Sequence, residues 1–444
     1  MNVTSSLVAL SDGTLPASFK GLRSHLPLEW IEEALQRGGV GKLRERKLSV
    51  EDIVWLVIGM GLYRDLPMID VIHKLDLVLP EEDGTPGTVT KGAIPPARSR
   101  VGVEPLKELF QITTRHWALE SAERYRWRGL MVLGGDGSVL RVPDSPENRS
   151  EFKLPPSSRS TAGYPQVRLA VLMVLRSHLW LDFEFADCRT GEGTVAWPLV
   201  QRVPPKSVTM LDRYYIKYEE LYSLQSRGED RHWLVRAKKN LKWKVVKRLG
   251  RGDTLVEITL PTKVRKEHPD WPPTFLARAV QYRRQGFRTR TLLTSLLDPK
   301  AYPAGEIAEL YHERWELELG YDELKTDVLE QEEAIRSETP DGVRQELWGM
   351  AIAYNLVRRE MDLAAREMGL PPRRLSFLAA LRLIRDLFHS AAITGTPGAL
   401  PKRIRRMRVN LARLILPPRR SERRYPRHVK IKMSNYARNR KHPR

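Results

Sequence analysis

The sequence has one cysteine and no long hydrophobic segment. With Cys188 alone, the chain can form neither an intramolecular disulfide framework nor a cysteine-rich zinc site, and this fits a reducing compartment. The longest strongly apolar stretch, Ile53–Tyr63, is too short to span a bilayer, which takes ~20 residues. Met1–Pro16 has no basic residue before its short apolar run, unlike a secretory signal peptide. We therefore expect a soluble, cytoplasmic protein with no membrane partner.

Acidic residues are too few to balance the basic ones. The 444 residues include 75 Lys and Arg but only 54 Asp and Glu, a formal charge of +21, and 41% are hydrophobic, enough for a packed core. Residues 402–444 hold 17 of the basic residues and one acid, so this tail carries +16 of the charge. A basic tail with several prolines favours a phosphate-rich partner, nucleic acid first. The alternative is a solvated tail without a specific role.

A second basic cluster lies in residues 236–251, which contain eight Lys and Arg, no acid, and Trp243. Basic residues interleaved with an aromatic are typical of a nucleic-acid surface, because the charges meet phosphates and bases stack on the ring. An equally weighted alternative is a pair of strands with lysines along an exposed edge.

Helical patterns dominate the start of the chain, and the pattern becomes mixed from residue 130. Residues 80–100, rich in Gly, Pro and Thr, are expected to form a loop. Short apolar runs such as Leu130–Leu133 and Ser207–Leu211 predict strands, and residues 304–329 predict one long helix. The predicted organisation is an α-helical domain (1–122), a mixed α/β domain (123–340) with a β-rich insertion at about 228–288, and a helical C-terminal region with a basic tail (341–444).

Three acids stand out by position. Asp136 and Asp212 each follow a short apolar strand, and Glu318 lies within the long predicted helix. Carboxylates at the ends of neighbouring strands can converge, and an acid from a helix packed on the sheet can join them. Hard oxygen ligands of this kind bind Mg²⁺ or Mn²⁺, and two such ions can promote phosphoryl transfer.

Structural explanations compete with this interpretation. Asp136 and Gly137 can form a hairpin turn, Asp144 is a nearby competing acid, and Asp212 can cap the helix that follows. A stronger signal is a column on one helical face, where four residues fall within an arc of roughly 60° at ~100° per residue. These are Tyr311, Arg314, Glu318 and Lys325. Cations flanking a carboxylate can hold DNA phosphates beside a metal ligand, whereas an ion-paired surface helix is the alternative.

This column resembles the signature Y-x2-R-x3-E-x6-K of DDE transposases of the insertion-sequence-four family, with every spacing matched. In that family the first catalytic Asp often lies in a strand followed by Gly-Ser/Thr, as in residues 135–138 here. The second often occurs as Asp-Arg-x-aromatic, as in residues 212–215. The order of the three acids and the β-rich insertion before the glutamate also match. The resemblance covers about residues 28–358.

The resemblance implies a ribonuclease-H-like core in which Asp136, Asp212 and Glu318 bind Mg²⁺ or Mn²⁺, with two ions per active site. It implies cut-and-paste transposition, in which water attacks at the end of the element and the freed 3′-hydroxyl then attacks the opposite strand or the target. The implied partners are the terminal inverted repeats, the target DNA and a second copy of the chain in a homodimer. Association with the nucleoid through DNA is expected.

The resemblance also assigns DNA contacts. Tyr311, Arg314 and Lys325 are expected to contact phosphates, and Arg213 to lie near the DNA or the acids. Some members of the family form a DNA hairpin and flip a base onto a Trp of the insertion. The candidates are Trp233, Trp243 and Trp271, of which Trp243, in the basic cluster, is assigned to DNA binding. Two alternatives remain open: another ribonuclease-H-like nuclease, and a non-catalytic DNA-binding protein derived from a transposase.

Overall fold

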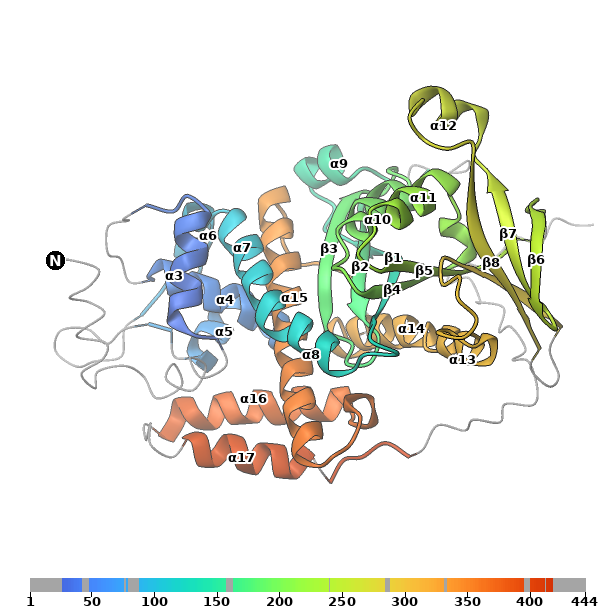
Figure 1. Cartoon of the computed structure of the whole chain (residues 1–444). Helices are drawn as coiled ribbons and strands as arrows, with labels where there is room; N and C mark the ends of the chain where they lie inside the picture. Colours follow the sequence, from blue (N-terminus) through green and yellow to red (C-terminus); the bar gives the residue numbers. More distant parts are fainter. Residues whose placement is uncertain are drawn as a thin grey trace, which may run out of the picture.

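The structure, a computed structural model, describes residues 26–41, 48–75, 77–78, 88–156, 163–238, 240–283, 288–330, 334–394, 400–411 and 413–417. In these ranges, helices surround a single nine-stranded sheet (Figure 1). The predicted mixed α/β fold is confirmed. The predicted domain boundaries stay predictions.

Five strands form the half of the sheet that carries the acids, in the order β3-β2-β1-β4-β5. β1, β4 and β5 run parallel, and β2 and β3 are antiparallel to their neighbours. Every residue of β4 is buried, as expected for a central parallel strand covered on both faces. The bounds are β1 Met131–Arg141, β2 Gln166–Val174, β3 Trp180–Asp187, β4 Ser207–Leu211 and β5 Arg231–Arg236.

The remaining four strands extend the same sheet as an antiparallel meander from β5, in the order β9-β8-β7-β6. Their bounds are β6 Lys244–Gly250, β7 Asp253–Thr259, β8 Thr274–Tyr282 and β9 Arg290–Thr294, with α12 (Thr262–Glu267) between β7 and β8. β5 pairs with β4, so it belongs with the parallel strands, although the predicted insertion began near residue 228. β6 is the exposed edge strand, as one reading of the basic cluster predicted.

Helices cover both faces of the sheet. α10 (Glu192–Gln201) and α11 (Tyr218–Ser226) lie on one face, while α13 (Ala304–His312) and α14 (Trp315–Asp322) lie on the other (Figure 1). Glycines in β1 permit this close approach. A Cβ on Gly134 would come within 2.9 Å of Leu317 in α14, and one on Gly135 within 3.5 Å of Val200 in α10. Alternate residues of β1 therefore face alternate helices.

The N-terminal helices form a separate lobe around the long helix α15 (Pro340–Glu367), which packs on α4 and α7 (Figure 1). α4 begins at a capping box between Ser49 and Asp52. The predicted loop at 80–100 is wrong from Lys91 onward, because η1 and α6 are helical there. Proline favours the first turn of a helix, and Pro95 lies in the first turn of α6. The bounds are α3 Leu28–Arg37, α4 Val50–Leu62, α5 Met68–Leu75, η1 Lys91–Ala93, α6 Ile94–Val101, α7 Glu104–Thr113, η2 Thr114–Ala118 and α8 Leu119–Arg124.

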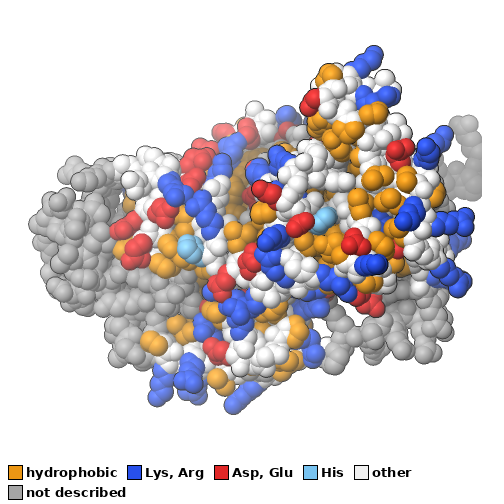
Figure 2. All heavy atoms as spheres, in the orientation of Figure 1, with side chains coloured by type: hydrophobic (Ala, Val, Ile, Leu, Met, Phe, Trp, Pro, Cys, Tyr) orange, Lys and Arg blue, Asp and Glu red, His pale blue; other side chains and the backbone are white. Residues whose placement is uncertain are grey.

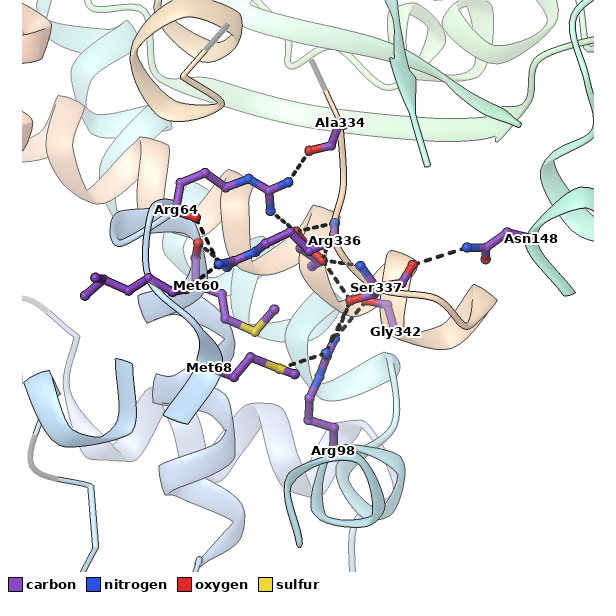
Figure 3. Close-up of polar contacts among 11 residues, drawn as sticks. Met60, Arg64, Met68, Arg98, Asn148, Ala334, Arg336, Ser337 and Gly342 are labelled. Carbon is purple, nitrogen blue, oxygen red and sulfur yellow. Dashed lines mark hydrogen bonds and ion pairs between the residues drawn. The ribbon is translucent and has the colours of Figure 1, made fainter. Parts of the chain in front are cut away.

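A buried charged cluster joins this lobe to the segment that leaves the half of the sheet carrying the acids (Figure 3). Glu346 of α15 forms an ion pair with Arg64 and accepts hydrogen bonds from the backbone N–H groups of Arg336 and Ser337, at 3.1 and 3.0 Å. Arg98 of α6 donates to the Ser337 hydroxyl at 3.2 Å. Although burial acts to raise it, the arginines Arg64 and Arg336 hold the pKa of Glu346 below its ordinary value. Glu346 therefore holds the two parts together as an anion.

The C-terminal region consists of α15, η5 (Pro372–Arg374), α16 (Phe377–Thr394) and α17 (Leu400–Leu411). Pro371 lies between α15 and η5. α17 buries Ile404 and Met407, while Lys402, Arg405 and other basic residues stay exposed. Within the described residues, α17 is the helical part of the basic tail. Residues 418–444 lie outside the described residues. No helix in the described ranges is long and apolar enough to cross a membrane.

Candidate active site

Asp136 lies in the middle of β1 rather than after a strand. The predicted strands on either side of it are one continuous strand, so the hairpin-turn explanation is wrong. Parallel pairing with β4 ends at Gly135, opposite Leu211, so Asp136 is the first residue of β1 beyond the end of β4. Its side chain shares a face with Gly134 and thus points to the α14 side. Tyr321 of α14 donates a hydrogen bond to the Asp136 carbonyl at 2.8 Å and ties the helix to the strand.

Asp212 directly follows β4 and is therefore the neighbour of Asp136 across the parallel pair, where strands lie ~4.8 Å apart. It also caps the 3₁₀ turn η3 (Arg213–Tyr215), because its Oδ1 accepts the Arg213 N–H at 2.5 Å. The capping explanation and the functional one both hold for this residue. Its side chain is 39% exposed and lies 4.0 Å from the Arg236 guanidinium.

Glu318 lies on α14, but the predicted long helix is interrupted. α13 ends at His312, α14 begins at Trp315, and residues 323–328 form the π-helical turn η4. The predicted column is therefore not one continuous stripe, because a turn at 313–314 separates Tyr311 from Glu318. Helix-favouring residues on both sides concealed the break. A π-helical turn widens the helix at Lys325, and such turns are frequent at functional sites.

One guanidinium interacts with all three acids. Arg314 donates to Glu318 Oε1 at 2.8 Å, and its charge acts on both Asp136 and Asp212. The structure thus gathers Asp136, Asp212, Glu318 and Arg314 in one place, from two strands and one helix. The contact between Arg314 and Glu318 is the i,i+4 ion pair of the alternative considered above, and in addition the Arg314 charge acts on two acids of the sheet.

The surroundings of Asp136 disfavour the charged form of its carboxyl group. Burial raises the pKa of Asp136 to about 6, and the nearby carboxylates of Glu192 and Asp212 add to the rise. The backbone N–H of Gly137, which donates to its Oδ1 at 2.9 Å, and the Arg314 charge oppose it. Crowded carboxylates of this kind are stabilised by added positive charge.

The donor set fits a hard divalent cation in chemistry, because carboxylate oxygens are the ligands that Mg²⁺ and Mn²⁺ prefer. The ligands are not preassembled: among the described residues, no three His, Cys, Asp or Glu side chains are close enough together to hold a metal ion. Glu318 instead accepts a hydrogen bond from Arg314 in this structure.

Two further members of the column have different surroundings. Tyr311 is buried, and its hydroxyl donates to the Leu211 carbonyl at 3.4 Å, so it fixes α13 to the end of β4. Burial raises the pKa of Tyr311 to about 12, so the phenol is neutral at pH 7. Lys325 is half-buried in η4. Tyr311 is therefore tied to the end of the strand that precedes Asp212.

Aromatic residues flank the acids at the surface. Arg213 is exposed, and its neighbour Tyr214 is 59% exposed, immediately after Asp212. Trp315, 52% exposed, directly follows Arg314. Trp315 was not among the predicted residues, although its place inside the signature was a usable signal. Asp144, the competing acid, pairs with Arg149 instead and is not part of the group.

The three candidate tryptophans of the insertion differ in exposure. Trp233 is fully buried in β5, and Trp271 packs against His268 and Tyr222, with ring centroids 4.1 and 4.8 Å away. Trp243 is half-buried just before the exposed strand β6. Trp233 is thus a core residue in this structure, whereas Trp243 and Trp271 are both half-buried and pack against the core.

A buried network on the far side of α14, absent from the sequence predictions, holds that helix in place. His178, in the turn between β2 and β3, lies 2.8 Å from Glu316 and 3.3 Å from Glu323. Arg358 and Tyr354 of α15 also bond Glu323, the latter at 2.9 Å. Although burial acts to raise it, Arg358 and His178 lower the pKa of Glu323 to about 2. Long-range pairs of this kind leave no periodic signal in a sequence.

Comparisons with known proteins give the family of the chain. Residues 16–111 match the family model described as "Insertion element 4 transposase N-terminal", and residues 130–356 match "Transposase DDE domain". The chain is 33% identical over 416 residues to "Transposase InsG for insertion sequence element IS4" of Escherichia coli (strain K12), covering 94% of this chain and 92% of that protein. It is 30% identical over 267 residues to "Putative transposase InsZ" of the same organism, covering 60% of this chain and 86% of that protein.

A solved structure is also similar in outline. The cryo-EM structure of a piggyBac transposase synaptic complex with hairpin DNA matches 92% of this chain and 87% of its own, at 11% identity and a TM-score of 0.39. At that score the similarity supports no conclusion. The DDE domain match, together with the mixed sheet, confirms the predicted ribonuclease-H-like core and the predicted enzyme class. With both family models matched in order along its length, the chain belongs to the DDE transposases of the insertion element 4 family.

Proposed function

We propose that this transposase cuts DNA at the terminal inverted repeats of its own insertion sequence and transfers the freed 3′-hydroxyl by a metal-dependent cut-and-paste reaction. The observation that supports this most directly is the gathering of Asp136, Asp212 and Glu318 around Arg314. Members of the DDE class act with divalent metal ions, and we infer two Mg²⁺ or Mn²⁺ ions held by these three acids. Such ions, when bound, activate a water or a 3′-hydroxyl and stabilise the leaving oxygen.

The residues of the chain provide placement. The pairing of β1 with β4 holds Asp136 and Asp212 side by side. The hydrogen bond from the Tyr321 hydroxyl to the Asp136 carbonyl keeps α14 next to them. Arg314 is a neutralising group for the three acids before DNA binds. On DNA binding, its planar guanidinium suits a bidentate contact to a phosphate.

DNA is proposed to lie across the acids and along the inserted strands. We propose Lys325 and Arg213 as phosphate contacts, and the exposed Tyr214 and Trp315 rings as stacking surfaces. At the far edge, the exposed side chains of β6 include Lys244, Lys247 and Arg248, and Figure 2 shows Lys and Arg side chains gathered at that end of the molecule. We propose Trp243, next to β6, as the ring of the insertion that meets a base.

Two copies are proposed to act together, because two ends of the element must be held at once. The nearest competing function is that of a ribonuclease-H-like nuclease without strand transfer. The DNA on either side of the coding region distinguishes the two, since inverted repeats immediately outside it are expected only for an insertion sequence. Joining of a labelled end to target DNA by the purified chain is the direct test. Cleavage without joining would leave only the nuclease function.

The basic tail is proposed to bind phosphates. Truncation after Leu416 removes 11 Lys and Arg. We expect weaker binding of end DNA. We also expect the slope of log Kd against log salt concentration to fall by about 0.9 for each phosphate that the tail no longer neutralises. Fluorescence anisotropy between about 50 and 200 mM NaCl measures this slope, and a control variant with those 11 residues replaced by glutamine separates charge from length. An unchanged slope would show that the tail is only solvated.

A further inference from the structure

Glu192, at the start of α10, lies against the strand that carries Asp136. A Cβ on Gly137 would come within 2.5 Å of Glu192 Cγ and 2.7 Å of its Cδ, so the glutamate side chain crosses the bare backbone of Gly137. Any larger residue at 137 would push it aside. The close contact with Glu192 therefore explains why residue 137 is a glycine. Gly137 directly follows Asp136, a proposed metal ligand, so Glu192 lies next to that ligand's neighbour in the strand.

The end of β4 opens a gap in the sheet at this point. Pairing between β1 and β4 stops at Gly135 and Leu211, while β1 continues to Arg141. Beyond Gly135, β1 has no β4 residue beside it in the ladder. Side chains from both faces of the sheet can reach this end of β4: α14, which carries Glu318, lies on one face, and Glu192 of α10 lies on the other, over Gly137.

The hydrogen bonds of Glu192 tie it to the segment that carries the second acid. The Tyr215 hydroxyl donates to Glu192 Oε1 at 2.6 Å, and Tyr215 is three residues beyond Asp212. The other oxygen lies 3.7 Å from the Arg168 guanidinium of β2. A carboxylate has about four acceptor sites, so these two partners leave room for a cation. The Glu192 charge acts on Asp136 more strongly than the Asp212 charge does.

We propose that Glu192 is a fourth carboxylate of the metal site, meeting Asp136 from the face opposite Glu318. This inference rests on the proposed metal-dependent function. It gives the arrangement four carboxylates instead of three, and it assigns Tyr215 the role of aiming Glu192 toward Asp212 and Asp136. The competing explanation is structural: the bonds to Tyr215 and Arg168 only fasten α10 to the sheet.

The test measures metal binding by the full chain without DNA, with Mn²⁺ alone as the probe. Electron paramagnetic resonance titration gives the Kd of Mn²⁺ for the wild type and for Glu192→Gln. We expect a Kd about 10-fold higher in the variant, the size of effect seen when a group that orients or supports a metal ligand is removed. The Mg²⁺ concentration for half-maximal cleavage should rise by a similar factor, with the rate recovering at saturating Mg²⁺. Glu192→Asp should fall in between.

The matched control is Glu184→Gln on β3, which also removes one carboxylate of the sheet but whose partner is Arg202, at 3.0 Å. It should leave the Mn²⁺ affinity unchanged, and an equal loss in both variants would overturn the proposal. So would wild-type affinity in a folded Glu192→Gln chain. If that variant does not fold, as judged by circular dichroism, wild-type affinity in Glu192→Asp overturns it instead.

Two further variants separate this inference from the proposed function. Asp136→Asn and Asp212→Asn should each weaken Mn²⁺ binding at least as much as Glu192→Gln. If both retain wild-type affinity, the metal site itself is misplaced and the proposed function fails. If they lose affinity while Glu192→Gln does not, the metal site stands and the fourth carboxylate is excluded.

Discussion

Asp136→Asn is expected to lower the rate of Mg²⁺-dependent cleavage of end DNA by about 10³-fold or more, while end binding persists. The amide removes a charge that supports a cation, and metal charge stabilisation supplies several kcal/mol of a phosphoryl-transfer barrier. At ~1.4 kcal/mol per factor of ten, the loss of about 4 kcal/mol corresponds to that change. Glu318→Ala should lower the cleavage rate in the same way, because it removes the proposed metal-binding carboxylate that α14 contributes. Strand cleavage on labelled DNA carrying the terminal inverted repeats gives the rate.

The control for this prediction is Asp144→Asn. Asp144 is an acid close in sequence to Asp136, but it pairs with Arg149 at the surface and lies outside the group around Arg314. Its replacement should leave cleavage within twofold of the wild type. Undiminished cleavage in Asp136→Asn or Glu318→Ala would remove these residues from the active site.

Glu346→Ala is expected to lower the free energy of unfolding by about 3–5 kcal/mol, the cost of leaving buried cations without their anion. Glu346 is the shared partner of Arg64, Arg336 and Ser337, between the N-terminal lobe and the catalytic half of the sheet. The pKa of Glu346 is lower in the folded chain than in the unfolded chain. Its contribution to the free energy of unfolding is therefore fully present above the unfolded-state pKa and is lost as the pH falls through the folded-state pKa. Urea denaturation at pH 7 and at pH 3.5 measures both effects.

The matched control is Glu104→Ala, which removes one partner of an exposed ion pair with Lys107, 3.7 Å apart. Exposed pairs contribute little, so the free energy of unfolding should change by no more than about 0.5 kcal/mol. A loss below about 1 kcal/mol in Glu346→Ala would contradict the assigned role of the cluster in joining the two parts.

The three candidate acids are proposed from strand ends and a helix stripe, which are local patterns. The structure changes two of these premises, because Asp136 lies within β1 and a turn at 313–314 interrupts the helix. Asp212 follows a short, mainly apolar run, and Glu318 lies at fixed spacings from Tyr311 and Arg314. Local patterns alone left each acid ambiguous. The resemblance to a family combined them, and the register of β1 on β4 explains how two of them become neighbours.

Other features could not be predicted because they depend on pairings between distant residues. The continuity of β1 through Gly134 to Gly137 arises from the ladder with β2, which overrides the turn preference of glycine. The break after His312 was hidden in a helix-favouring composition. Glu192 gave no motif at all: only its contact with Gly137 reveals it.

The central claim is that the acids gathered around Arg314 carry out metal-dependent cleavage at the ends of the element. The most direct measurement is cleavage of DNA labelled across one terminal inverted repeat by the full chain, with Mg²⁺ and with EDTA, for the wild type and Asp212→Asn. The account predicts a cut at the element boundary that exposes a 3′-hydroxyl, seen only for the wild type with Mg²⁺. Equal cutting in EDTA, or by Asp212→Asn, would contradict it.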